Sequence, residues 1–133
     1  VPPPKIKKYE TEEDAMSSVG TILARSTDTK LILVASLSGS AGRIVSRYRA
    51  EIPIFVSTNH TRVARQLNIS WNVVPFVLPS CSSIEELIER AMAYLLQKKL
   101  VKKSDNVVVI AGEPVGVSGH INFIEIRRAG GIA

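Results

Sequence analysis

A loop rich in serine and glycine is the part of this sequence best suited to binding chemistry. It runs Ser36-Leu37-Ser38-Gly39-Ser40-Ala41-Gly42, after five apolar residues (31–35) and before a segment with helical apolar spacing. A strand–loop–helix turn of this kind points several backbone N–H groups at one place, and the helix dipole adds partial positive charge there. The serine hydroxyls are further donors. The segment therefore favours an anion, above all a phosphate group.

Two other interpretations of this loop follow from the same residues. Any strand-to-helix turn needs small residues, so an empty turn stays open as an alternative. The loop has neither the Gly-Lys-Ser/Thr of a P-loop nor a GxGxxG pattern. A nucleophile elbow needs Gly-x-Ser-x-Gly, and Gly39 and Gly42 do not flank a serine at that spacing. Covalent catalysis by a loop serine is therefore not expected.

Composition narrows the class of protein. The chain has 133 residues, enough for one domain with a core, and a net charge of +5, which suits anions of any size. Only 5% of the residues are aromatic and the basic residues form no stripe, so no nucleic-acid partner is expected. No apolar run approaches the roughly 20 residues of a membrane span. With one cysteine (Cys81) and two histidines, we expect no disulfide, no metal site, no membrane partner and a cytoplasmic location.

Apolar periodicity predicts alternating helices and strands. The expected elements are a helix capped by Thr11 and ending near Arg25, strand 31–35, helix 41–50, strand 54–57, a helix capped by Thr58-Asn59 and ending near Leu67, strand 71–78, helix 84–98, strand 107–111 and strand 121–126. This order predicts an α/β fold, a three-layer αβα sandwich on a five-stranded mixed sheet. The last strand should be antiparallel because no helix precedes it. Residues 1–10 are interpreted as a linker or cut end, 11–128 as the domain and 129–133 as a tail.

Local signals refine these elements. Pro75 removes a ladder donor, which predicts an edge position for its strand. Ser82 followed by Glu85 predicts a capping box for the long helix, and the uniformly apolar strand 107–111 should be interior. Loops 36–42 and 112–120 follow the first and fourth strands. If those strands are neighbours, both loops border one crevice at the carboxyl edge of the sheet.

Five segments, taken in order, resemble the C-terminal domain of pyruvate kinase. They are Ser38-Gly39 with Ile44–Arg49 (SG…VSKYRP in the family), Ile52–Ile54 with Val63–Leu67 (CPIIAVT…ARQL), Val73–Pro75 (GVYPV), Lys102–Val109 (KKGDxVVVV) and Gly112–Gly119 (GxPxGxxGTTN). Each segment alone is a weak signal. Their shared order and spacing make the resemblance specific, and it spans the chain from Thr11 to Ile126.

The resemblance implies a regulatory domain that binds an effector and contacts other subunits. In the family, a separate barrel domain transfers phosphoryl between phosphoenolpyruvate and ADP with magnesium and potassium. This chain alone should therefore be inactive, with no catalytic residue, no cofactor and no metal. Its implied partners are its own catalytic barrel and further copies of the chain, a tetramer in the whole enzyme. The implied effector-phosphate residues are Ser36, Ser38, Gly39, Ser40 and Ala41, and the implied lid residues are Gly116, Val117, Ser118, Gly119 and His120.

Departures from the family pattern affect the implied effector. Leu37 and Ala41 stand where enzymes regulated by fructose 1,6-bisphosphate have a lysine and a hydroxyl, and Leu87 stands where they have an arginine. His120-Ile121-Asn122 replaces Thr-Thr-Asn. A sugar monophosphate or AMP is therefore expected rather than fructose 1,6-bisphosphate. The alternatives are a purely structural oligomerisation domain with an empty loop, joined through strand 121–126, and a stand-alone anion-binding module.

Overall fold

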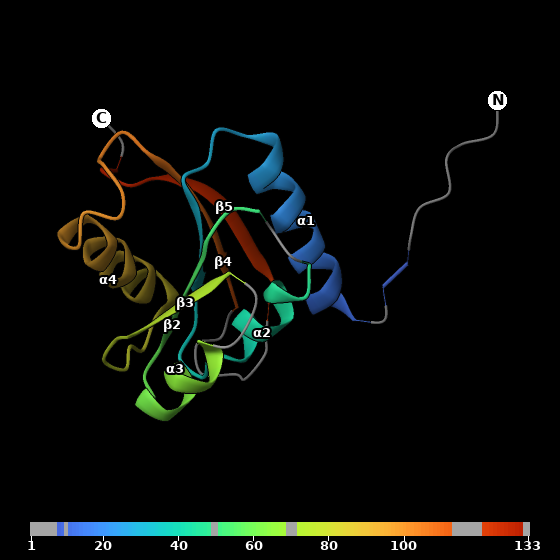
Figure 1. Cartoon of the computed structure of the whole chain (residues 1–133), viewed down its shortest axis with the longest axis horizontal. Coiled ribbons are helices and arrows are strands. Elements are labelled where there is room, and N and C mark those ends of the chain that lie inside the picture. Colours follow the sequence, from blue (N-terminus) through green and yellow to red (C-terminus); the bar gives the residue numbers. More distant parts are fainter. Residues whose placement is uncertain (1–7, 10, 49–50, 69–71, 113–120, 132–133) are drawn as a thin grey trace.

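The computed structural model describes residues 8–9, 11–48, 51–68, 72–112 and 121–131 (Figure 1). Its elements, in chain order, are α1 (Glu12–Ser26), β1 (Leu31–Ala35), α2 (Ser40–Ser46), β2 (Ile54–Thr58), α3 (Thr61–Leu67), β3 (Val73–Val77), α4 (Ile84–Gln97), β4 (Asn106–Ala111) and β5 (Phe123–Arg128). Helices and strands alternate up to β4, as the apolar periodicity predicts.

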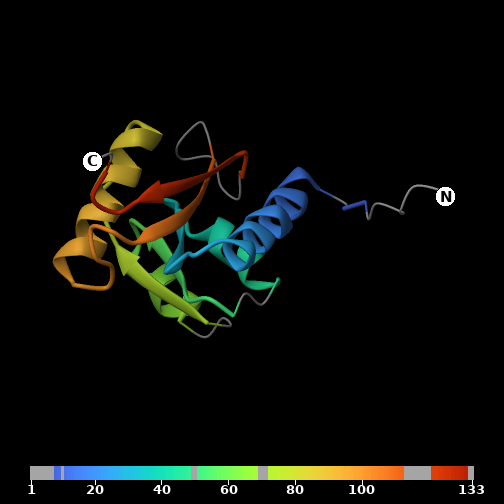
Figure 2. The same cartoon turned by 90° about the horizontal axis from the view of Figure 1, so that it is seen from above.

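The strands form one mixed sheet in the order β3-β2-β1-β4-β5. β1 lies at its centre and pairs in parallel with both β2 and β4, and β5 pairs antiparallel with β4. Figure 2 shows β5 at one edge of the sheet and β3 at the other. The predicted fold is confirmed, and so are the interior position of β4 and the edge position of the strand that contains Pro75.

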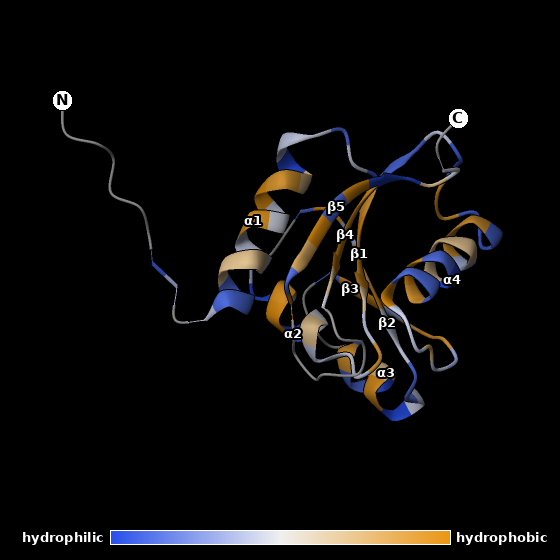
Figure 3. Ribbon diagram, turned by 180° about the vertical axis from the view of Figure 1, so that it is seen from behind, coloured by the Kyte–Doolittle hydropathy of each residue, from blue (hydrophilic) through white to orange (hydrophobic). Residues whose placement is uncertain are grey.

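Helices cover both faces of the sheet. α4 packs on one face, where Leu87, Ile88 and Leu95 meet Leu33 and Val109 of the strands. α1, α2 and α3 cover the other face, and the apolar core on this side is formed by Ala24, Val45, Leu67, Ile32, Val34, Val108 and Ile110, among others. Figure 3 shows the apolar strands between these helices. Because β1 and β4 are buried on both faces, nearly all of their residues are apolar.

Side-chain caps fix the starts of the two longer helices, α1 and α4. The Asp14 N–H donates to Thr11 Oγ1, so the predicted cap of α1 is confirmed. The cap of α4 is Ser83, whose hydroxyl accepts the Glu86 N–H at 3.2 Å, so the prediction of Ser82 is wrong by one residue. Ser82-Glu85 and Ser83-Glu86 have the same capping-box spacing, and the sequence pattern alone does not separate the two registers.

Two predicted helices differ from the observed ones at their ends. α2 ends at Ser46 rather than near residue 50, and Arg47 is its C-cap. α3 begins at Thr61 with His60 as its cap. Thr58 cannot cap α3 because it is the last residue of β2, and its hydroxyl donates to the Leu37 carbonyl at 2.8 Å.

The last strand is also shifted from its predicted range. β5 begins at Phe123 and continues to Arg128, because Arg127 and Arg128 pair with Val107 and Asn106 of β4. The Arg127 guanidinium also forms a bidentate pair with the Glu85 carboxylate of α4: Nη1 donates to Oε1 at 3.0 Å and Nη2 to Oε2 at 3.2 Å. The Gly130 N–H then donates to the Lys103 carbonyl at 2.9 Å, so packed backbone continues beyond β5.

Candidate functional site

The loop after β1 is held in place by its own hydrogen bonds and by β2. Ser36 Oγ accepts the Gly39 N–H at 2.7 Å. Ser57 Oγ accepts the Ser36 N–H at 2.8 Å and donates to the Ser36 carbonyl at 2.7 Å. The Leu37 carbonyl accepts from Thr58 Oγ1. The loop is therefore fixed from both sides before α2 begins.

Gly39 is the turning point of the loop for two physical reasons. Its φ is +81°, in the left-handed region where a side chain is disfavoured. A Cβ added to Gly39 would lie 2.7 Å from Val63 Cγ1 and 3.0 Å from Leu67 Cδ1, both on α3. The loop thus packs directly on α3, and only glycine fits at this position.

Two serine hydroxyls lie together where α2 begins. Ser38 Oγ and Ser40 Oγ are 3.3 Å apart, and the Ser40 N–H points to Ser38 Oγ at the same distance. No acidic residue occupies the first turn of α2, so no carboxylate there repels an anion. Hydroxyl donors and the positive end of α2 therefore occur on one short segment.

The predicted phosphate residues all lie on this segment, but in different settings. The Ser36 hydroxyl already accepts the Gly39 N–H, so it holds the loop in its conformation. Ala41 is 4% exposed, so only its backbone is suited to a ligand. The five predicted lid residues, Gly116, Val117, Ser118, Gly119 and His120, lie outside the described residues.

The predicted meeting of two strand ends is confirmed. Ala35 of β1 pairs with Ala111 of β4, so the residues that follow both strands leave the sheet at the same edge. Gly112 is the last described residue of the second loop, and the chain is described again from Ile121. The Asn122 N–H donates to the Ala111 carbonyl at 3.0 Å, which returns the chain to this edge.

Sequence reasoning missed three residues at the end of β2. Ser57 and Thr58 are fully buried and bond the loop. The Asn59 N–H donates to the Leu37 carbonyl at 2.9 Å, and its side-chain amide donates to Ser80 Oγ at 2.8 Å. Among the described residues, no donor reaches the buried Asn59 Oδ1. The available signal was the polar run Ser57-Thr58-Asn59 at the carboxyl end of an apolar strand, the edge where ligands of α/β sheets bind.

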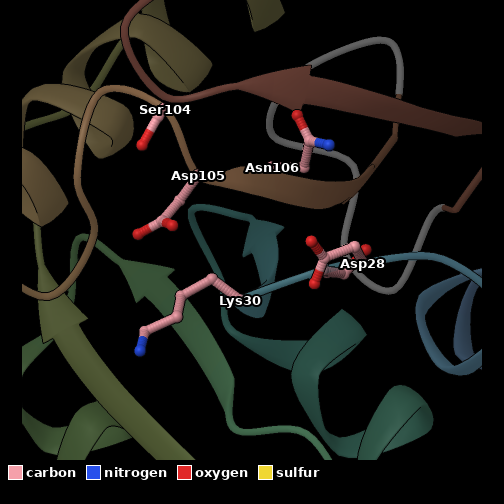
Figure 4. Close-up of a pocket in the computed structure, with 6 residues that line it drawn as sticks. Asp28, Lys30, Ser104, Asp105 and Asn106 are labelled. Atoms are coloured by element: carbon pink, nitrogen blue, oxygen red, sulfur yellow. The ribbon is translucent and has the colours of Figure 1, made fainter.

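A second polar region lies at the opposite edge of the sheet. A cavity of about 190 Å³ is lined by Asp28, Thr29, Lys30, Ser104, Asp105 and Asn106 (Figure 4). These residues flank the starts of β1 and β4, whereas the serine loop follows the end of β1. Asp105 already accepts the Lys102 N–H at 2.8 Å. This cavity is separate from the loop and shares no residue with it.

Within the described residues, no three His, Cys, Asp or Glu residues are grouped so that they could hold a metal ion. None of the described helices is both long and apolar enough to cross a membrane.

Comparisons with known proteins identify the family of this chain. The family model described as pyruvate kinase, alpha/beta domain, matches residues 14–127, and the chain belongs to this family. The pyruvate kinase of Clostridium acetobutylicum is 37% identical over 111 residues, covering 83% of this chain and 24% of the relative. The pyruvate kinase of Lactococcus lactis is 36% identical over 104 residues, covering 78% of this chain and 20% of the relative.

A solved structure shows the same fold. It is Cryptosporidium parvum pyruvate kinase in complex with ADP, with a TM-score of 0.79 and 27% identity, covering 93% of this chain. This chain spans only 25% of that structure's chain and 24% of the Clostridium acetobutylicum enzyme. The similarity therefore concerns one domain of a larger kind of protein.

Proposed function

We propose that this chain is the regulatory domain of a pyruvate kinase and that it binds a phosphorylated metabolite on the loop from Ser36 to Ala41. The observation that carries the proposal is the loop geometry: the left-handed Gly39 brings the Ser38 and Ser40 hydroxyls together at the start of α2. The same loop packs against the polar end of β2.

The charge around the loop supports an anionic ligand. α2 carries Arg43 and α3 carries Arg62 and Arg65, and neither helix has an acidic residue in its first turn. Arg43 contacts α3 by donating to Gln66 Oε1 at 2.8 Å. The two helices beside the loop are thus basic, and their field attracts phosphate-bearing molecules.

The ligand class follows from the polar atoms near the loop. One pair of serine hydroxyls suits one phosphate group, and Leu37 and Ala41 supply no side-chain donor for more. A sugar monophosphate or AMP fits this set better than fructose 1,6-bisphosphate.

The whole protein would be a cytoplasmic pyruvate kinase. Its catalytic barrel, outside this chain, would transfer phosphoryl from phosphoenolpyruvate to ADP with magnesium and potassium. Support comes from family membership and from the quarter of each relative that this chain spans. An effector that binds one quaternary arrangement more tightly than another shifts the whole enzyme towards it.

A thermal-shift titration tests ligand binding. Ribose 5-phosphate, glucose 6-phosphate, AMP and fructose 1,6-bisphosphate are compared on the wild-type chain and on Ser38→Asp, which places a negative charge in the loop. A ligand at 100 times its Kd adds about 2.7 kcal/mol to stability, or roughly 10 °C for a chain of this length. The matched control is Ser104→Asp, the same change at the exposed opposite edge of the sheet.

The outcomes separate effector binding from an empty loop. A monophosphate should raise the melting temperature of the wild type and of Ser104→Asp, but not of Ser38→Asp. A shift that persists in Ser38→Asp would reject the loop as the phosphate site. No shift with any of the four compounds would favour the structural alternative.

A second candidate function, subunit contact, is favoured by the exposed edge at β5. Among the described strands, β5 pairs only with β4, because it ends the sheet. On β5 itself, Ile126 is 46% exposed, and α1, which contacts β5, exposes Val19 and Ile22 by 54% and 50%. An open strand edge with apolar neighbours is suited to pairing with a second copy. This contact is compatible with effector binding.

Sedimentation tests the subunit contact with two matched variants. Ile126→Glu places a charge at the β5 edge, and Val77→Glu does the same at the β3 edge, where Val77 is 45% exposed. We expect Ile126→Glu to lower self-association and Val77→Glu to leave it unchanged. Equal sedimentation of both variants and the wild type would reject the β5 edge as the interface.

A further inference from the structure

The far end of α2 is fastened to α1 by a small polar cluster. The Tyr48 hydroxyl donates to Asp14 Oδ1 at 3.2 Å, and the Arg47 guanidinium lies 3.6 Å from the same oxygen. Asp14 stands in the first turn of α1, where Thr11 caps the helix. Tyr9 joins the cluster, with its ring 6.2 Å from that of Tyr48 and its hydroxyl 2.7 Å from Ser18 Oγ.

α2 is too short to be stable without its neighbours. It has seven residues, whereas isolated helices shorter than roughly 12–15 residues are marginal in water. Its start is held by the Ser36–Gly39 hydrogen bond and its end by Tyr48 and Arg47. Its middle lies on β2, since a Cβ on Gly42 would come within 2.7 Å of both Val56 methyl groups. The position of α2 is therefore determined at both ends.

We propose that α2 transmits changes in the Ser36–Ala41 loop to α1, and that the contact of Tyr48 and Arg47 with Asp14 is the point of transmission. About 10 Å separates the two ends of a seven-residue helix, so a shift of one end necessarily moves the other. The regulatory meaning of this coupling rests on the proposed function, because the loop is the proposed effector site.

The coupling would connect the loop to the proposed subunit contact. Gly20 of α1 lies against Ile110 of β4 and Ile124 of β5, with an added Cβ at 2.6 and 3.5 Å from their Cδ1 atoms. α1 also carries the exposed Val19 and Ile22. A displacement of α1 would thus reach the β5 edge. Packed elements with two discrete arrangements are the physical means by which distant sites are coupled.

Hydrogen–deuterium exchange of the full 133-residue chain tests the coupling without any ligand. Ser36→Ala removes the hydroxyl that accepts from Gly39, and Gly39→Ala is a second loop perturbation. Each is measured alone and combined with Tyr48→Phe, which lacks the donor to Asp14. The loss of one hydrogen bond should speed exchange of α2 amides by roughly 2- to 12-fold. Amides of α4, on the other face of the sheet, are the internal control.

In the chain that keeps Tyr48, we expect the loop variants to speed amide exchange both in α2 and in the first turns of α1. In the Tyr48→Phe background, they should still affect α2 but add nothing in α1. The control Tyr94→Phe, on α4, should leave the coupling intact. Unchanged α1 exchange in both loop variants, or an α1 response that survives Tyr48→Phe, would overturn the proposal.

Adding inorganic phosphate separates this inference from the proposed function. Phosphate should slow exchange in the loop and in α1 of the wild type, but only in the loop of Tyr48→Phe. This result supports both phosphate binding at the loop and its coupling to α1. If exchange in the loop does not respond to phosphate, this counts against phosphate binding there. The comparison of the loop variants with and without Tyr48→Phe then still decides the coupling. A response of α1 equal in wild type and Tyr48→Phe overturns the coupling while leaving phosphate binding intact.

Discussion

Replacing Gly39 with alanine should destabilise the domain more than the same change at a glycine whose added Cβ would meet open space. The left-handed φ of +81° costs an alanine about 1–2 kcal/mol. The added Cβ would also press on Val63 Cγ1 at 2.7 Å and on Leu67 Cδ1 at 3.0 Å, and overpacking of this kind costs about 1–3 kcal/mol. The two effects together predict a loss of about 2–5 kcal/mol.

Gly131 provides the matched control. It has the same φ of +81°, but an added Cβ would meet no atom within 4 Å. Gly131→Ala should therefore show only the backbone cost. Urea and thermal unfolding followed by circular dichroism measure both variants, and a 3 kcal/mol loss corresponds to roughly 10 °C in melting temperature. If Gly39→Ala lost no more stability than Gly131→Ala, the packing of the loop on α3 would be wrong.

Two further predictions concern Tyr48 and the cap of α4. Burial, followed by the hydrogen bond to Asp14, raises the pKa of Tyr48 above its ordinary value of 10.0. Its stabilising contribution is therefore present below that value and lost as pH rises through the raised pKa. When the pH is raised above 10, the free energy of unfolding measured with urea should fall more for the wild type than for Tyr48→Phe. Ser83→Ala should cost about 1 kcal/mol and Ser82→Ala almost nothing; the reverse order would contradict the observed cap.

The sheet could be predicted because its residues carry strong local signals. β1 and β4 are apolar along nearly their whole length, which marks them as interior. Pro75 marks β3 as an edge strand. The missing helix before β5 gives its antiparallel direction.

Element ends were harder to predict because long-range contacts set them. β5 extends to Arg128 through its pairing with β4 and the contact of Arg127 with Glu85 on α4. α2 ends early, where Arg47 and Tyr48 meet Asp14 of α1. These partners are far apart in the sequence, so no local pattern contains them.

The sequence could point to the loop of the candidate site, but not to the residues that support this loop. Small residues and hydroxyls between a strand and a helix identify Ser38, Gly39 and Ser40 from the sequence. The contribution of Ser57 and Thr58 depends on β2 lying beside β1, which requires the sheet order. The engagement of Ser36 with Gly39 depends on a turn conformation that composition does not specify.

The measurement that tests the central claim most directly is an NMR titration of the ¹⁵N-labelled chain with AMP and with ribose 5-phosphate. Phosphate binding at the loop predicts saturable shifts that are largest for the backbone amides of Ser38, Gly39, Ser40 and Ala41 and that disappear in Ser38→Asp. Amide shifts confined to other parts of the chain, or no saturable shift with either compound, would contradict an effector site at this loop.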